Sequence, residues 1–109
     1  MATISNIVID QGTTFSLDVN LTNDDTTAKD LTGYTTTAQM RKGYESTTAT
    51  DFTTAQVNAT GKITISLTAA QTAAIKSGRY VYDIEIASSS ETLRVLEGLV
   101  TVTPNVTRA

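Results

Sequence analysis

The sequence contains neither cysteine nor histidine, and each absence excludes a class of chemistry. Without cysteine the chain has no disulfide, no thiolate nucleophile and no sulfur ligand for a metal. Without histidine it lacks the commonest general base, the commonest metal ligand and the side chain that titrates near neutral pH. Tryptophan is also absent, and Pro104 is the only proline. We therefore predict a protein that is not an enzyme, with no catalytic residue, no cofactor and no metal site.

Clustered basic charge and long apolar runs are absent as well. The net charge is −3 and the eight basic residues are scattered, whereas nucleic-acid binding requires a basic surface. The strictly apolar runs at residues 7–9 and 73–75 are three residues long, and a membrane-spanning helix needs about 20. The N-terminus has no signal-peptide pattern. We expect neither a nucleic acid nor a membrane as a partner.

The residues that are abundant favour strands. About a fifth of the 109 residues are threonine, which is β-branched and suits a strand with a polar outer face. The length is that of one domain. We predict a single β-sandwich domain over residues 1–103, followed by a C-terminal tail over residues 104–109.

Apolar and polar residues alternate along several segments, as in half-buried strands. These segments are residues 13–21, 34–41, 57–67, 79–87 and 91–103, with a short apolar run at 4–9 and a weaker strand near 51–54. Turn signals separate them at intervals of about 8–12 residues, which is typical of an Ig-like sandwich. The predicted fold is all-β, an antiparallel Ig-like β-sandwich of six or seven strands.

Two local signals refine this prediction. Thr68 and Gln71 have the spacing of a capping box, which predicts one short helix near residues 69–76. Within the last strand the apolar positions change parity, and we predict a β-bulge at Glu97 and Gly98 that brings both halves to the same face.

Tyr80 begins the strongest predicted strand and has two interpretations. In Ig-like sandwiches a tyrosine at this place donates a hydrogen bond to the preceding turn, and Tyr82 then stands where antibody domains have a cysteine. Alternatively, both tyrosines are ordinary core residues. On the same strand Asp83 and Glu85 are expected to lie on the outer, solvated face rather than in a catalytic cleft.

A few residues are candidates for binding a partner. Tyr44 and Phe52 flank one loop, where they form either an exposed aromatic platform or part of the core. The tail follows a proline that ends the last strand, and its residues Asn105, Val106 and Arg108 are candidates for docking on a neighbouring protein.

Several segments resemble one family of proteins. They are residues 7–15, 30–34, 38–42, 67–72, 77–85, 94–104 and 106–108, of which Asp-Leu-Thr-Gly-Tyr (30–34) and Gly-Arg-Tyr-Val-Tyr-Asp (78–83) are the most specific. Nearly end to end, the chain resembles the small β-sandwich virion proteins of tailed bacteriophages, especially those of cyanobacterial and marine phages. It resembles more loosely the Ig-like N-terminal domain of phage upper baseplate proteins.

The resemblance implies a structural subunit of the virion, assembled in the bacterial host cytoplasm. Its partners would be other virion proteins of the capsid or tail, and it would be multimeric in the particle. Three places stay open: a capsid decoration or cement protein, a neck component, or a tail or baseplate component. A carbohydrate- or receptor-binding module on the same fold is the alternative function.

Overall fold

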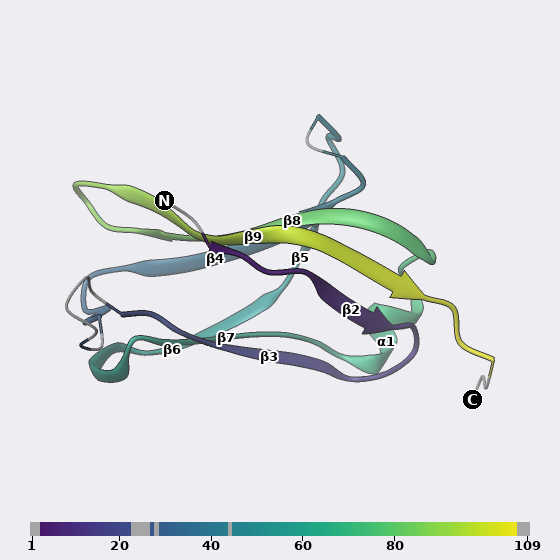
Figure 1. Cartoon of the computed structure of the whole chain (residues 1–109), viewed down its shortest axis with the longest axis horizontal. Coiled ribbons are helices and arrows are strands. Elements are labelled where there is room, and N and C mark those ends of the chain that lie inside the picture. Colours follow the sequence, from purple (N-terminus) through teal and green to yellow (C-terminus); the bar gives the residue numbers. More distant parts are fainter. Residues whose placement is uncertain (1–2, 23–26, 28, 44, 107–109) are drawn as a thin grey trace.

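The computed structural model describes residues 3–22, 27, 29–43 and 45–106, which form two stacked β-sheets (Figure 1). The larger sheet contains β1 (Thr3–Ile4), β2 (Ile7–Asp10), β4 (Thr35–Arg41), β5 (Thr50–Asp51), β8 (Gly78–Ala87) and β9 (Thr92–Thr103). The smaller sheet contains β3 (Phe15–Asn20), β6 (Thr53–Val57) and β7 (Lys62–Leu67). A 3₁₀ turn, η1 (Asn58–Thr60), joins β6 to β7, and one helix, α1 (Ala69–Ala73), joins β7 to β8.

This architecture confirms the predicted all-β sandwich with one short helix. Seven of the described strands have four or more residues, and β1 and β5 add two short pieces of two residues each. One part of the prediction is wrong, because the larger sheet is not wholly antiparallel. Both β1 and β2 run parallel to β9. The first and last strands of the chain thus form this edge of the sheet and run in the same direction.

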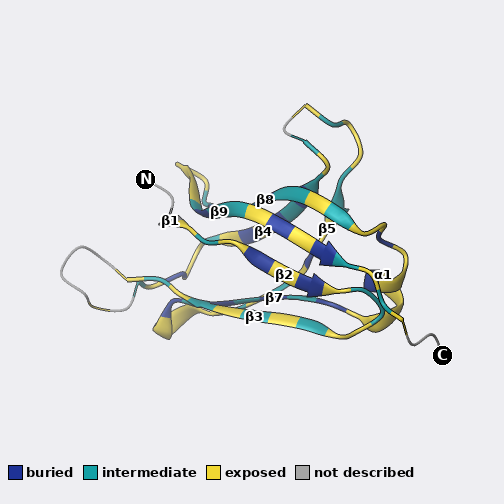
Figure 2. Ribbon diagram, turned by 45° about the vertical axis from the view of Figure 1, so that its right-hand side comes forward, coloured by how far each residue is buried: buried dark blue, intermediate teal, exposed yellow. Residues whose placement is uncertain are grey.

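The core lies between the two sheets and follows the predicted alternation. Along β4 the residues Thr36, Ala38 and Met40 are buried, and along β7 every second residue from Ile63 to Leu67 is buried. Burial alternates in the same way along β2 and β8 (Figure 2). The inward faces of both sheets are therefore apolar, and the outward faces carry the polar side chains.

The helix α1 begins as predicted and ends earlier. The Thr68 hydroxyl accepts a hydrogen bond from the Gln71 N–H, and the Gln71 side chain accepts one from the Thr68 N–H, which completes the capping box. The helix ends at Ala73 rather than near residue 76. Ile75 turns into the core instead, and its carbonyl accepts a hydrogen bond of 2.8 Å from the side chain of Gln11.

The β-bulge lies two residues before the predicted position. Ile84 pairs with Leu96 and Glu85 pairs with Arg94, so Val95 is the extra residue of β9. The prediction at Glu97 and Gly98 is wrong because Gly98 already shares the inward parity of the buried residues Leu96 and Val100.

Tyr80 forms the predicted tyrosine corner. Its hydroxyl donates a hydrogen bond of 2.7 Å to the carbonyl of Lys76, four residues earlier. Tyr82 is buried two residues later, and its ring meets that of Phe52 edge-on at 6.5 Å between centroids. The first of the two interpretations of Tyr80 is therefore correct, and Tyr82 fills the core at the place where antibody domains have a cysteine.

Candidate functional site

The structure separates the residues that the sequence proposed as binding candidates. Tyr44 and Arg108 lie outside the described residues, so their predicted role stays a prediction. Phe52 is only 5% exposed and packs between Phe15 and Tyr82. It is a core residue, and its assignment to a partner-binding site is wrong, because its place beside β6 directs it between the sheets.

In the described part of the C-terminal tail, Pro104 and Val106 are exposed and Asn105 between them is half-buried. The Asn105 N–H donates a hydrogen bond of 3.3 Å to the Gln11 side chain, which anchors the start of the tail beside the turn after β2. Val106 follows and is 96% exposed. Asn105 is thus an anchoring residue, whereas Val106 is accessible to a neighbour.

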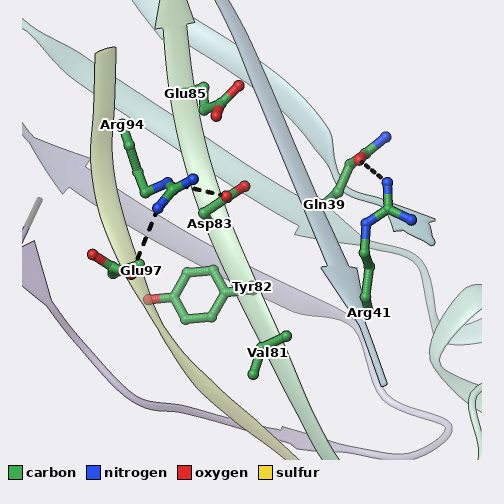
Figure 3. Close-up of a pocket in the computed structure, with 8 residues that line it drawn as sticks. All are labelled: Gln39, Arg41, Val81, Tyr82, Asp83, Glu85, Arg94 and Glu97. Atoms are coloured by element: carbon green, nitrogen blue, oxygen red, sulfur yellow. Dashed lines mark hydrogen bonds and ion pairs between the residues drawn. The ribbon is translucent and has the colours of Figure 1, made fainter. Parts of the chain in front are cut away.

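A different surface brings more candidate groups together, on the outer face of the larger sheet. Here β4, β8 and β9 form an open groove of about 300 Å³ that is lined mainly by charged and polar side chains (Figure 3). Gln39 and Arg41 come from β4, Asp83 and Glu85 from β8, and Arg94 and Glu97 from β9. The two acidic residues of β8 thus lie on the outer face, as predicted.

The charged groups of this groove are partly paired. The Arg94 guanidinium lies 3.2 Å from the Asp83 carboxylate and 4.0 Å from that of Glu97. Arg41 donates hydrogen bonds to the carbonyl of Ser46 and the side chain of Gln39. All these groups are at the surface, where ion pairs contribute about 0–1 kcal/mol to stability, so the groups stay available to a ligand or partner.

Three large apolar side chains lie beside these charges and are also exposed. They are Ile4 (74% exposed), Val8 (65%) and Leu99 (37%). The registers of β1 and β2 with β9 place all three on the outer face, because Ile4 pairs with Glu97 and Val8 with Thr101. This surface was not among the binding candidates predicted from the sequence, although the alternation along residues 7–9 indicates that Val8 faces away from its buried neighbours.

Potential metal ligands are not clustered in the described residues. No group of three or more potential metal ligands occurs among them. In the same part of the chain, no helix has the length and apolar character needed to span a membrane.

Three side chains have shifted pKa values, each with a structural cause. Burial raises the pKa of Tyr82, and its hydrogen bond to the Ser5 carbonyl partly opposes this effect. The hydrogen bond from the Tyr34 hydroxyl to Glu91 raises the pKa of Tyr34. The hydrogen bonds from Thr32 lower the pKa of the Asp30 carboxyl.

The order of the strands identifies the class of sandwich. The smaller sheet runs β3-β7-β6, which corresponds to Ig strands B, E and D, and β9-β8-β4-β5 corresponds to G, F, C and C′. The fold is Ig-like. The tyrosine corner at the start of β8, the F strand, agrees with this assignment.

Comparisons with known proteins find a similar fold in one solved structure and a weaker likeness in a second. No family model matches the chain, and no curated protein matches it. Among solved structures, the crystal structure of Listeria monocytogenes InlP resembles it with a TM-score of 0.52 at 14% identity, over 94% of this chain and 28% of that one. The N-terminal four Ig domains of Dscam1 isoform 7.44 resemble it with a TM-score of 0.47 at 18% identity, over 94% and 23% of the two chains. The chain therefore spans about a quarter of each of these proteins.

Proposed function

We propose that this chain is a non-enzymatic structural subunit of a tailed-bacteriophage virion that acts through contacts with other virion proteins. The resemblance of its segments to small phage β-sandwich proteins suggests the particle. The observation that carries a binding role is the outer face of the larger sheet, where Ile4, Val8 and Leu99 are exposed beside a groove of charged side chains. Such a mixed surface suits association with another protein.

The C-terminal tail supplies a second contact in this proposal. It leaves the sandwich beside the turn after β2, at the opposite end from the β8–β9 hairpin (Figure 1), and exposes Val106 almost fully. A single tail of this kind binds weakly. The symmetry of a particle presents many copies at once, so weak contacts add up to stable attachment.

Electron microscopy of intact particles with a labelled antibody tests the proposal, together with mass spectrometry of purified virions. Label on the capsid would make the chain a decoration or cement protein, whereas label at the neck, tail or baseplate would make it a tail-side component. If the protein is absent from purified particles, the proposed function is wrong.

Deleting residues 104–109 tests the contribution of the tail. We expect weaker incorporation into particles and an unchanged melting temperature, because residues 104–106, the described part of the tail, add no side chain to the core. Val106→Ser should reproduce part of the loss, and Val57→Ser, on the exposed face of the smaller sheet, is the matched control. Normal incorporation of the deleted chain would exclude a role of the tail.

A carbohydrate- or receptor-binding module remains the alternative function, but the described aromatic residues do not favour it. A sugar platform needs accessible ring faces, and Phe52 and Tyr82 are buried. The Lys42 ammonium lies over the Tyr80 ring, 4.9 Å from its centroid. Binding on a glycan array would support the module over the virion subunit.

A further inference from the structure

The registers of the larger sheet arrange its outward side chains in rows that cross the strands. One row contains Val81 of β8, which is the direct partner of Leu99 of β9 on one side and of Arg41 of β4 on the other. The next row towards the β8–β9 hairpin contains Asp83 and Glu97, and Ile4 extends it at the edge. The next row in the other direction contains Arg79 and Thr101, and Val8 extends it in the same way.

Charged side chains lie on both sides of the Val81–Leu99 pair. The hairpin side of the Val81–Leu99 row carries Asp83, Glu85 and Glu97, which outnumber the single guanidinium of Arg94. On the opposite side lies Arg79, which is exposed and has no ion pair within the described residues. Val81 and Leu99 thus separate Arg79 from Asp83 and Glu97, and the exposed Asp10 of β2 lies on the Arg79 side, at the edge of the sheet.

A face with this pattern is complementary to a second copy of itself. When two copies pack face to face with their β8 strands antiparallel, a two-fold axis can lie along the Val81–Leu99 row. Val81 and Leu99 then meet their own counterparts. The row that contains Arg79 and Val8 in one copy then lies against the row that contains Asp83 and Ile4 in the other copy. Arg79 therefore faces Asp83 of the second copy, and Val8 faces its Ile4. A parallel arrangement would instead place the acidic groups against each other.

We propose that the outer face of β1, β2, β8 and β9 is a self-association surface, and that a second copy of this chain packs on it antiparallel about the Val81–Leu99 row. Of the six large hydrophobic side chains that are exposed in the described residues, three lie on this face: Ile4, Val8 and Leu99. The dimer removes them from water, which is the main driving force for such association.

The size of the face predicts a weak dimer. From Arg79 to Glu85 the strand β8 is about 20 Å long, and the strands are spaced about 4.8 Å apart. The footprint is therefore smaller than the roughly 800 Å² per partner that a standard interface buries. The β4–β5 connection also projects beyond the sheet on this side (Figure 1), which limits the contact to β8, β9 and the edge formed by β1 and β2. We expect a reversible dimer that high salt weakens.

Sedimentation equilibrium of the purified chain over a wide concentration range tests the dimer itself. We expect monomer and dimer in exchange, with a dissociation constant on the order of micromolar to hundreds of micromolar. A chain that remains monomeric at a concentration on the order of 1 mM would overturn the proposal. Because this measurement involves no phage particle, its result is independent of the proposed virion function.

Charge reversal tests the orientation of the two copies. Arg79→Glu and Asp83→Lys should each weaken the dimer at least about tenfold, since like charges then face each other. The double variant restores opposite charges, and we expect its dissociation constant to return to within about threefold of the original. Thermal melts verify that every variant folds. Failure of the double variant to recover, with its fold intact, would exclude the antiparallel arrangement.

The absence of cysteine allows a clean cross-linking test of the axis. Leu99→Cys should be joined to its counterpart by a short bis-maleimide, because the two copies meet at this row. Val57→Cys on the smaller sheet is the matched control, since Val57 is 50% exposed and lies away from the proposed contact. Equal cross-linking of both variants would mean random collision and would contradict the proposed surface.

Discussion

At Gly98 the backbone of β9 passes so close to the N-terminal segment that no side chain fits. A Cβ atom built there would lie 2.2 Å from the Ser5 carbonyl oxygen. That carbonyl accepts a hydrogen bond of 2.5 Å from the hydroxyl of Tyr82, which pairs with Gly98 in the sheet. Gly98 therefore leaves room for the Ser5 backbone, which lies close enough to accept the hydrogen bond from Tyr82.

We predict that Gly98→Val destabilises the domain by about 1–3 kcal/mol, the usual effect of overpacking. The Ser5 backbone has to move, which also strains its hydrogen bonds to Tyr82 and Glu97. Chemical denaturation measures the loss. Gly43→Ala is the matched control, because a Cβ at Gly43 meets no atom within 4 Å. Equal stability of both variants would contradict the close approach.

Tyr82→Phe should have an effect that depends on pH. At pH 7 the lost hydrogen bond reduces the free energy of unfolding by about 1 kcal/mol. Burial raises the pKa of Tyr82 above its ordinary value of 10.0, so above pH 10 the unfolded chain loses its phenolic proton before the folded chain does. The original protein therefore loses stability as the pH rises through the folded pKa. The variant should decline less steeply, and parallel profiles would contradict this account.

At the level of elements, local sequence is sufficient for α1 and insufficient for β2. The capping box of α1 forms between residues three positions apart, so its start is a local property. Its end is not local, because Gln11 and the core hold Ile75 outside the helix. The parallel pairing of β2 with β9 joins residues more than 90 positions apart, and no nearby signal specifies it.

Thr68→Ala should remove the helix cap and lower stability by about 1 kcal/mol. Thr68→Ser keeps a hydroxyl at the same place and should retain most of the original stability. Thermal unfolding of both variants measures the difference. If serine and alanine destabilise equally, the hydroxyl is not the group that matters.

At the level of the whole molecule, the two ends of the chain differ in importance. Residues 7 and 9 are core isoleucines of β2, 7% and 1% exposed, whereas the tail after β9 adds no buried apolar residue to the described structure. The sandwich is thus closed by its N-terminal strand and not by its C-terminal tail.

Deleting residues 1–10 should abolish cooperative folding. Each buried isoleucine contributes about 2–5 kcal/mol, and the total stability of a small domain is only about 5–15 kcal/mol. Circular dichroism during heating distinguishes the outcomes, with the chain lacking residues 104–109 as the comparison. A cooperative transition at the original temperature in the N-terminal deletion would show that β2 is dispensable.

The sequence predicted the orientation of single residues of the candidate site, but not which of them lie together. Alternation along residues 79–87 showed that Asp83 and Glu85 face outward, and the structure places both there. It did not show that Ile4, Val8 and Leu99 share that face, because their proximity depends on the registers of β1 and β2 with β9. Phe52 was ambiguous for a similar reason, since a lone aromatic beside a loop has no alternating neighbours to indicate its face.

Sequence alone was sufficient for the all-β class, for the inward and outward faces of the alternating strands and for the helix cap, and it offered the tyrosine corner as one of two interpretations. These features depend on residues close in the chain, where the two-residue period and short hydrogen bonds act directly. The direction of β2, the position of the bulge at Val95 and the outer surface of the larger sheet became known from the folded chain. Each of these follows from pairing between distant segments, and local preference does not set which strands meet or in which register.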